Sequence, residues 1–256
     1  MKKKLIILGC GSSIGSPRID GFWGKSKKNK KNVRTRCSAI IVKGNNNILI
    51  DTSPDIKKQL ISNKIKDVSS VVFSHEHSDQ TNGLFELRPF YWKKKKKINI
   101  YGNKKTINHL TNTYKFLFKS IDSYYPAIIK SNLVKSKFSV GKKKSRVNFQ
   151  TFSAKHGKTN SIVYIFEKTA YISDVNDLSI VNAKQLKNLN YLIVDCFRIK
   201  KHVTHFNLND ALFVHKMLKP KKTILTNLHQ DLDYNSLLKK LPKNVLPAYD
   251  GLCINL

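Results

Sequence analysis

A short apolar run that ends in two histidines and an aspartate constrains the fold of this 256-residue chain more than any other feature. Residues 71–79, VVFSHEHSD, have the pattern of a buried strand followed directly by His75, His77 and Asp79. Side chains two residues apart in an extended segment point the same way, so both imidazoles can reach one cation. A metal centre at the end of a buried strand is therefore the first expectation.

Strand and helix patterns alternate along the chain, which indicates a layered α/β protein rather than a helical bundle or a β-sandwich. Apolar runs typical of strands occupy residues 4–8, 38–43, 47–51, 70–73, 98–102, 147–152, 161–166, 169–172, 191–195 and 223–226. Helical patterns occupy residues 53–65, 79–87, 104–118 and 207–218, and residues 14–36 are expected to form a long loop. Neither a linker nor an internal repeat divides the chain, so a single domain over residues 1–256 is expected.

Membrane insertion and a thiolate metal site are not expected. The chain has no apolar stretch of about 18 residues, the minimum for a membrane-spanning helix. The N-terminal apolar run, Leu5–Leu8, is too short for the core of a signal peptide. The cysteines are widely spaced and form no C-x-x-C pair. We therefore expect reduced thiols, a cytoplasmic location and no membrane partner.

The charge of the chain allows two interpretations. Its 48 Lys and Arg residues against 16 Asp and Glu give a net charge of +32. Such a surface attracts nucleic acids or anionic substrates. The excess is nearly all lysine, however, and is spread along the whole chain without matching arginines or interleaved aromatic residues. A compositional background is therefore favoured, and a nucleic-acid partner stays an alternative.

The histidine motif and several other segments, in the same order, resemble the metallo-β-lactamase-fold hydrolases. The likeness is greatest to the branch that contains the phosphoribosyl 1,2-cyclic phosphate phosphodiesterases. It covers nearly the full length and is carried by LGCGSSIGSPR (8–18), NVRTRCS (32–38), LIDTSPDI (49–56), SHEHSDQTNGL (74–84), KHGKT (155–159), YISDVNDL (171–178), THFNLNDAL (204–212), LTNLHQDLDY (225–234) and AYDGL (248–252). The resemblance implies an αββα sandwich with a metal site at the edge shared by its two sheets.

The resemblance also implies a ligand set. In the family, one metal ion is held by the two histidines of the H-x-H motif and by a later histidine. Here these are His75, His77 and His156. A single aspartate bridges to a second ion, and Asp174 in the segment YISD takes that position. The expected cofactor is Zn²⁺, because imidazole nitrogens suit this ion.

The chain departs from the family pattern at two positions. Gln80 stands where the family has a histidine after Asp79, and Asn227 stands where it has a late histidine. Both changes fall on the second metal site, which is therefore expected to be lost or altered. The remaining candidate ligands there are Asp79, Asp174 and the amide oxygens of Gln80 and Asn227, a set that suits Mn²⁺ or Mg²⁺ better than Zn²⁺. One Zn²⁺ is expected, and a second ion, Zn²⁺ or Mn²⁺, stays open.

Two residues are expected to take part in proton transfer. Asp79 would orient or deprotonate a metal-activated water. His205, in the segment THFN, resembles the family's proton donor to the leaving group. His202, three residues earlier, is a weaker candidate for the same role.

Four further residues are expected to support the site. Asp51 ends a buried strand and resembles the family's aspartate that steadies a metal-ligating histidine. His229 lies two residues beyond Asn227 and would need a local bulge to reach the metal. Arg34 and Arg36 are candidates for contacts with a substrate phosphate, with solvated loop charges as an equal alternative.

The expected function is metal-dependent hydrolysis of a small cyclic phosphate or nucleotide-like phosphodiester through a metal-activated water. An RNA-processing nuclease of the same fold is an alternative, which the lysine content favours and the lack of an obvious inserted substrate-binding arm disfavours. A degenerate, non-catalytic member that binds a ligand is a second alternative, because Gln80 and Asn227 replace histidines. A homodimer stays open.

Overall fold

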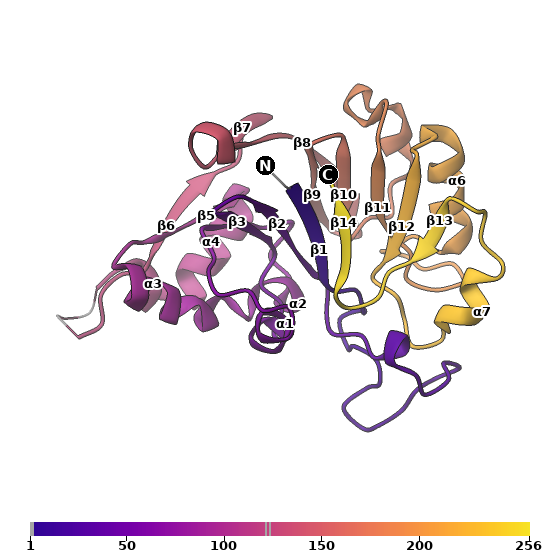
Figure 1. Ribbon diagram of the computed structural model, residues 1–256, viewed down its shortest axis with the longest axis horizontal. Coiled ribbons are helices and arrows are strands. Elements are labelled where there is room, and N and C mark those ends of the chain that lie inside the picture. The colour runs from indigo at the N-terminus through magenta and orange to yellow at the C-terminus, as the bar shows by residue number, and fades with distance from the viewer. Residues whose placement is uncertain (1–2, 121, 123) are drawn as a thin grey trace.

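The computed structural model describes residues 3–120, 122 and 124–256, which form two seven-stranded sheets that pack against each other (Figure 1). The first sheet has the strand order β14-β1-β2-β3-β4-β5-β6. Its strands are β1 (Lys3–Gly9), β2 (Ser38–Lys43), β3 (Asn46–Ile50), β4 (Ser70–Val72), β5 (Ile98–Gly102), β6 (Ile129–Leu133) and β14 (Leu252–Asn255). The first and last strands of the chain therefore lie side by side at one edge of this sheet.

The second sheet has the order β13-β12-β11-β10-β9-β8-β7. Its strands are β7 (Lys137–Val140), β8 (Val147–His156), β9 (Thr159–Phe166), β10 (Thr169–Ile172), β11 (Tyr191–Asp195), β12 (Lys222–Thr226) and β13 (Val245–Pro247). Half of each sheet is parallel: β3 to β6 in the first, and β10 to β13 in the second. Carboxyl ends of parallel strands meet at one edge, which is where such sheets carry their ligands.

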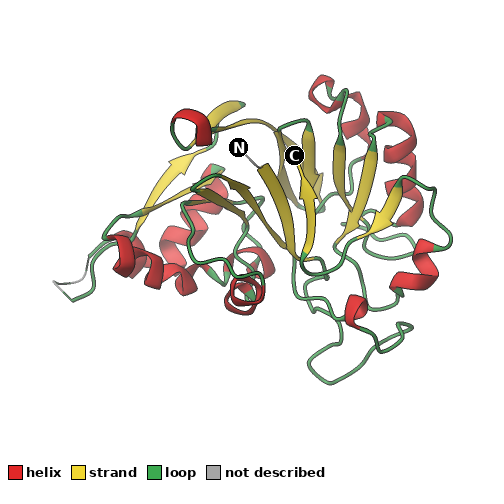
Figure 2. Ribbon diagram, in the orientation of Figure 1, coloured by secondary structure: helices red, strands yellow, loops and turns green. Residues whose placement is uncertain are grey.

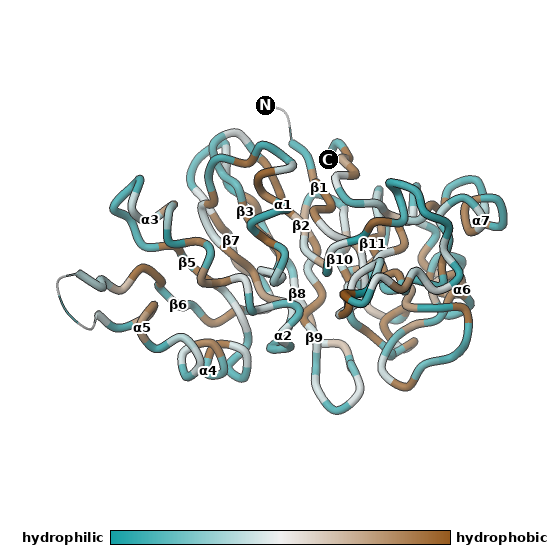
Figure 3. The backbone as a smooth tube through the Cα atoms, turned by 90° about the horizontal axis from the view of Figure 1, so that it is seen from below, coloured by the Kyte–Doolittle hydropathy of each residue, from teal (hydrophilic) through white to brown (hydrophobic). Residues whose placement is uncertain are grey.

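The side chains of one continuous apolar strand pack into two different cores, because successive residues point to opposite faces of the sheet. In β1, Leu5 and Ile7 belong to the core between the sheets, whereas Ile6 and Leu8 belong to the core on the outer face of the first sheet. A side chain changes face at every residue of a strand, so a strand buried on both faces is apolar throughout. Figure 3 shows these hydrophobic stretches along the strands and the hydrophilic loops at the periphery.

Helices cover the outer face of each sheet and complete the αββα sandwich (Figure 2). On the first sheet, α1 (Ile56–Ser62), α4 (Lys104–Thr113), α5 (Lys115–Phe118) and a 3₁₀ helix (Leu84–Leu87) contribute buried apolar residues. On the second sheet, α6 (Leu208–Leu218) and α7 (Tyr234–Leu238) do the same. The remaining helices are α2 (Ser78–Thr81), α3 (Arg88–Lys94) and the 3₁₀ helices Lys30–Asn32, Lys143–Ser145, Leu178–Asn182 and Lys184–Leu186. The layered α/β fold class is thereby confirmed.

The local predictions fail mainly where a segment is polar or interrupted. The helix expected over 104–118 is divided at Tyr114, whose backbone angles (φ −118°, ψ 43°) are not helical. The helix expected over 79–87 is a single turn, α2, followed by a 3₁₀ turn. Strands β6 and β7 were not expected, because as edge strands they are largely exposed and lack an apolar run. Among the described residues, no helix is long and apolar enough to cross a membrane.

Candidate metal centre and active site

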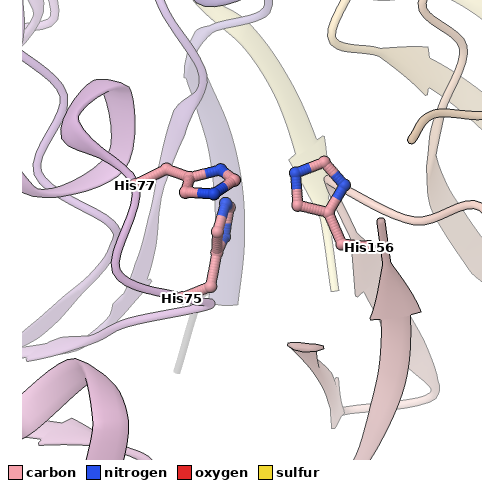
Figure 4. Close-up of side chains that lie close together, drawn as sticks. All are labelled: His75, His77 and His156. Atoms are coloured by element: carbon pink, nitrogen blue, oxygen red, sulfur yellow. The ribbon is translucent and has the colours of Figure 1, made fainter. Parts of the chain in front are cut away.

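Three histidines from the two sheets meet at one point. His75 follows β4, His77 caps the amino end of α2, and His156 is the last residue of β8. One ring nitrogen of each lies within 4.8 Å of the others. Figure 4 shows the three rings turned toward one another, with His156 opposite the pair from the first sheet. A cation among them would be within reach of three imidazole nitrogens.

The ring of His75 is held with its outer nitrogen free. Its Nδ1 lies 2.9 Å from Ser74 Oγ, and that hydroxyl donates to Asp51 Oδ2 at 2.9 Å. Because the hydroxyl proton goes to Asp51, Nδ1 must be the donor to Ser74, which leaves a lone pair on Nε2. That Nε2 is buried without any hydrogen-bond partner. Burial also lowers the pKa of His75 to about 3, so the ring is neutral, as a metal ligand must be.

His156 is oriented in the same way. Its Nδ1 lies 2.7 Å from the carbonyl oxygen of Thr204, which can only accept a hydrogen bond. The proton is therefore on Nδ1, and the lone pair of Nε2 faces the centre, 3.9 Å from Asp174 Oδ1. Burial lowers the pKa of His156. Neutral, oriented imidazoles with an unpartnered buried nitrogen are the donor set expected around Zn²⁺, so these residues fit the implied ion.

Asp51 takes its expected place at the end of β3 but reaches the histidine through Ser74. It is fully buried, and its Oδ1 also accepts the backbone N–H of Ser74 at 2.7 Å. The backbone at Asp51 has φ +61°, in the left-handed region that is uncommon for residues other than glycine. This unusual turn directs the carboxylate back toward the chain that carries His75.

The centre opens into a cavity of about 720 Å³. The cavity is lined by Ser13, Glu76, His77, Asp79, Lys105, His156, Gly157, Lys158, Thr159, Asp174, Val203, Thr204 and His205. Burial, and then the negative charge of Asp174, raise the pKa of Asp79 to about 6. The structure therefore brings His77, His156, both expected carboxylates and the expected proton donor to one cavity of a size that suits a small molecule. His75 is buried directly behind it, with its ring 4.4 Å from that of His77.

Gln80 and Asn227 lie beside the carboxylates, but with their nitrogens toward them. Gln80 Nε2 is 3.1 Å from Asp79 Oδ2 and 3.4 Å from Asp174 Oδ2. Asn227 Nδ2 is 3.3 Å from Asp174 Oδ1. The amide oxygen of Gln80 is buried and unpartnered. In this arrangement the groups that face the two carboxylates are hydrogen-bond donors, not the amide oxygens expected as candidate ligands.

His205 is paired with a carboxylate that the sequence analysis missed. Its Nδ1 lies 2.8 Å from Oδ2 of Asp195, the fully buried last residue of β11. Burial alone would lower the pKa of His205, but Asp195, Asp174 and Asp79 raise it to about 9. The ring is therefore an imidazolium at neutral pH, with its second N–H free to donate. The sequence does contain a signal for Asp195. Residues 191–195 are an apolar run that ends in an aspartate, like residues 48–51, which end in Asp51.

His229 and His202 do not line this cavity. His229 Nδ1 is 3.3 Å from Asp231 Oδ2, and its ring packs against Phe197 at 5.1 Å, so the structure does not bring His229 to the position expected for a residue that supports the metal. His202 Nδ1 accepts from Thr204 Oγ1 at 3.1 Å and lines a neighbouring cavity. The ring of His229 packs beside Phe197, outside the cavity, instead of turning toward the metal position.

Arg34 and Arg36 also have structural roles instead of the expected contacts with substrate. Arg34 is 2% exposed, and its guanidinium donates to the carbonyl oxygens of His229 and Leu232 at 3.1 and 2.5 Å. Arg36 Nε lies 3.2 Å from Asp55 Oδ2. Neither arginine lines the cavity. Arg34 instead ties the long loop of residues 14–36 to the segment that follows β12.

Replacing Arg34 by methionine should destabilise the fold without emptying the metal centre. The change removes three hydrogen bonds of a buried guanidinium and leaves the carbonyl oxygen of Leu232 without this donor, whereas His229 O and Asn32 Oδ1 keep backbone N–H donors; the loss costs about 2–5 kcal/mol of unfolding free energy. Urea unfolding would measure this loss. Arg36→Met is the matched control, and the partly exposed pair with Asp55 should be worth less than about 1 kcal/mol. Equal effects of the two changes would contradict the anchoring role of Arg34.

The chain is similar over most of its length to a known family. Residues 46–227 match the model of a family described as the beta-lactamase superfamily domain. A protein of Porphyromonas gingivalis named octanoyltransferase is 24% identical over 253 residues. The match covers 97% of this chain and 51% of that protein, so the chain spans about half the length of this relative.

Solved structures share the whole fold. A diphosphatase from the PhnP family is 26% identical, with a TM-score of 0.87 and coverage of 100% of this chain and 98% of the other. Zn²⁺-bound PqqB from Methylobacterium extorquens is 13% identical, with a TM-score of 0.76 and coverage of 99% and 100%. Human tRNase Z, short form, is 16% identical, with a TM-score of 0.70 and coverage of 98% of each chain. The last two likenesses concern the fold alone.

Proposed function

The chain belongs to the beta-lactamase superfamily and has the fold of its metal-dependent hydrolases, and from this premise we propose that it hydrolyses small, nucleotide-like or cyclic phosphodiesters. One observation carries the proposal. Three imidazoles, of which those of His75 and His156 are neutral and held by hydrogen bonds, surround one point beside a cavity that Asp79 and the imidazolium of His205 line. This set supplies a cation site, a base or water-orienting carboxylate, and an acid within one small space.

A Zn²⁺ ion held by His75, His77, His156 and Asp174 would supply an activated water at neutral pH and polarise a phosphoryl oxygen. The protein groups supply the rest. Asp79, with its raised pKa, is placed to orient the attacking water and accept its proton. His205 is held by Asp195 so that its outer N–H can be donated to the oxygen that leaves.

Two lysines give the cavity groups that can bind an anionic substrate of modest size. Lys105 and Lys158 line it, and Lys105 Nζ lies 2.6 Å from Glu76 Oε1, which holds that ammonium group at the rim. Lysine ammonium groups bind phosphate oxygens as point charges. The full-length likeness to a diphosphatase supports a phosphate ester or anhydride as the bond that is cleaved.

We do not assign to this chain the activity in the name of the Porphyromonas gingivalis relative, octanoyltransferase. Acyl transfer through a thiol needs an accessible thiolate. Cys10, Cys37 and Cys196 are buried, and burial raises the pKa of each thiol. None of the described residues that line the cavity is a cysteine. We therefore do not propose octanoyl transfer.

The Zn²⁺-loaded protein should hydrolyse bis(p-nitrophenyl) phosphate, and it should prefer this diester to p-nitrophenyl phosphate. A panel of nucleoside cyclic phosphates and nucleotide pyrophosphates would then identify the natural class by the ratio of kcat/KM values. Metal-stripped protein is the control. Failure of the loaded protein to exceed the stripped protein on every phosphodiester and pyrophosphate would contradict the proposed function.

A further inference from the structure

Both carboxylate oxygens of Asp174 are occupied by side-chain amide nitrogens. Gln80 Nε2 lies 3.4 Å from Oδ2, and Asn227 Nδ2 lies 3.3 Å from Oδ1. Asp174 is 2% exposed, Gln80 is fully buried and Asn227 is 2% exposed. The oxygens through which an aspartate would bridge two cations therefore already face hydrogen-bond donors.

The same two amides connect Asp174 to its neighbouring carboxylates. Gln80 Nε2 is also 3.1 Å from Asp79 Oδ2, and Asn227 Nδ2 is 3.2 Å from Asp195 Oδ1. Three carboxylates gathered out of water repel one another and need a compensating charge or donors. The amide N–H groups of the two side chains supply donors to all three carboxylates from within the chain.

The orientation of Gln80 shows which contacts dominate. Its Oε1 is buried without a partner, which is unfavourable for an amide oxygen. Hydrogen bonds to charged acceptors are about twice as strong as those between neutral groups, and the two carboxylates hold the nitrogen toward themselves. Asn227 is fixed at φ +60°, a backbone conformation that asparagine tolerates better than most residues. It stands between Asp174 and Asp195, with its nitrogen also 3.5 Å from the carbonyl oxygen of Ser173 and 3.1 Å from His205 Nδ1. Because that Nδ1 donates to Asp195, the two amide hydrogens of Asn227 are directed to the carboxylates of Asp174 and Asp195.

We propose that this cavity holds one metal ion, at His75, His77, His156 and Asp174, and that the amide N–H groups of Gln80 and Asn227 replace a second ion between Asp79 and Asp174. An amide nitrogen has no lone pair to offer a cation, so two donors at this position exclude one. This inference rests on the proposed function and adds to it, because it makes the hydrolase mononuclear. The dipoles of the two buried amide groups take the place of the second ion's positive charge beside the carboxylates.

The first test is the metal content of the whole protein. Wild-type protein is saturated with Zn²⁺, freed of unbound metal by gel filtration and measured by mass spectrometry. One ion per chain is expected, and two ions per chain, or none, would overturn the inference. Activity is measured separately: two ions with diesterase activity would sink only the inference, whereas one ion without any such activity would sink only the proposed function.

The second test converts each donor into an acceptor of the same shape. Gln80→Glu and Asn227→Asp each replace an amide nitrogen by oxygen and add a negative charge beside Asp174. Each variant should rise from one ion to two per chain under the same conditions. Gln185→Glu, which makes the same change at an exposed position outside the cavity, should stay at one. Circular dichroism confirms that each variant is folded, and a single ion in both folded site variants would overturn the role given to the amides.

Discussion

Replacing His77 by alanine should empty the metal centre and lower kcat/KM on phosphodiesters by about 10³-fold or more. The imidazole supplies one of three nitrogens around the cation, and a bound metal contributes several kcal/mol to the stabilisation of transition-state charge. His77 is the best of the three to replace, because it is exposed whereas His75 and His156 are buried. Its loss should therefore remove the ligand without a cavity in the core.

Metal content and thermal stability measure this effect independently of catalysis. A ligand that binds only the folded state raises its stability by mass action. Added Zn²⁺ should therefore raise the Tm of metal-stripped wild-type protein and leave that of the His77→Ala variant nearly unchanged. His109→Ala, on the outer helix α4, is the control and should behave as wild type. Unchanged Zn²⁺ affinity in the His77 variant would show that the three histidines are not a metal centre.

The strand that precedes His75 and His77 illustrates how much of this site the sequence can predict. A buried strand fixes the direction of the residues that follow it, so the H-x-H motif predicts a metal site from local geometry alone. His156 and Asp174 belong to the other sheet, so they could be assigned to the site only through the family resemblance. Asp195 was missed although residues 191–195 carry the same signal as residues 48–51. A single carboxylate at the end of a strand is common. Only the packing of the two sheets against each other shows which of these carboxylates lie close together.

The errors arise from side-chain direction, which periodicity does not give outside helices and strands. Arg34 lies in a long irregular loop, so its sequence cannot show that the guanidinium turns inward to carbonyl oxygens of residues 229 and 232. Gln80 and Asn227 lie beside Asp174, but which amide atom faces the carboxylates depends on all neighbours at once. That choice reverses the chemical meaning of both residues, from metal ligand to hydrogen-bond donor.

Replacing His205 by asparagine should produce a loss of activity that depends on the leaving group. A positioned acid contributes about 10²–10⁴-fold when the leaving oxygen must be protonated. We expect a loss of this size for an alkyl diester or a cyclic nucleotide. A nitrophenolate leaves without a proton, so the loss on bis(p-nitrophenyl) phosphate should be below about tenfold. His229→Asn, at a histidine that lies outside the cavity, should leave both activities near those of wild type.

The same variant distinguishes an acid from a metal ligand, because His205 also lies within 4.8 Å of ligand atoms of His156 and Asp174. An acid acts through its proton, so its removal should leave the metal content unchanged and affect only substrates that need that proton. A ligand acts through its lone pair, so its removal should lower the metal content and slow both substrates equally. The hydrogen bond from Nδ1 to Asp195 and the raised pKa favour the acid, since both keep a proton on the ring. Equal losses on both substrates, together with loss of metal, would assign His205 to the metal and would also weigh against a single-ion centre.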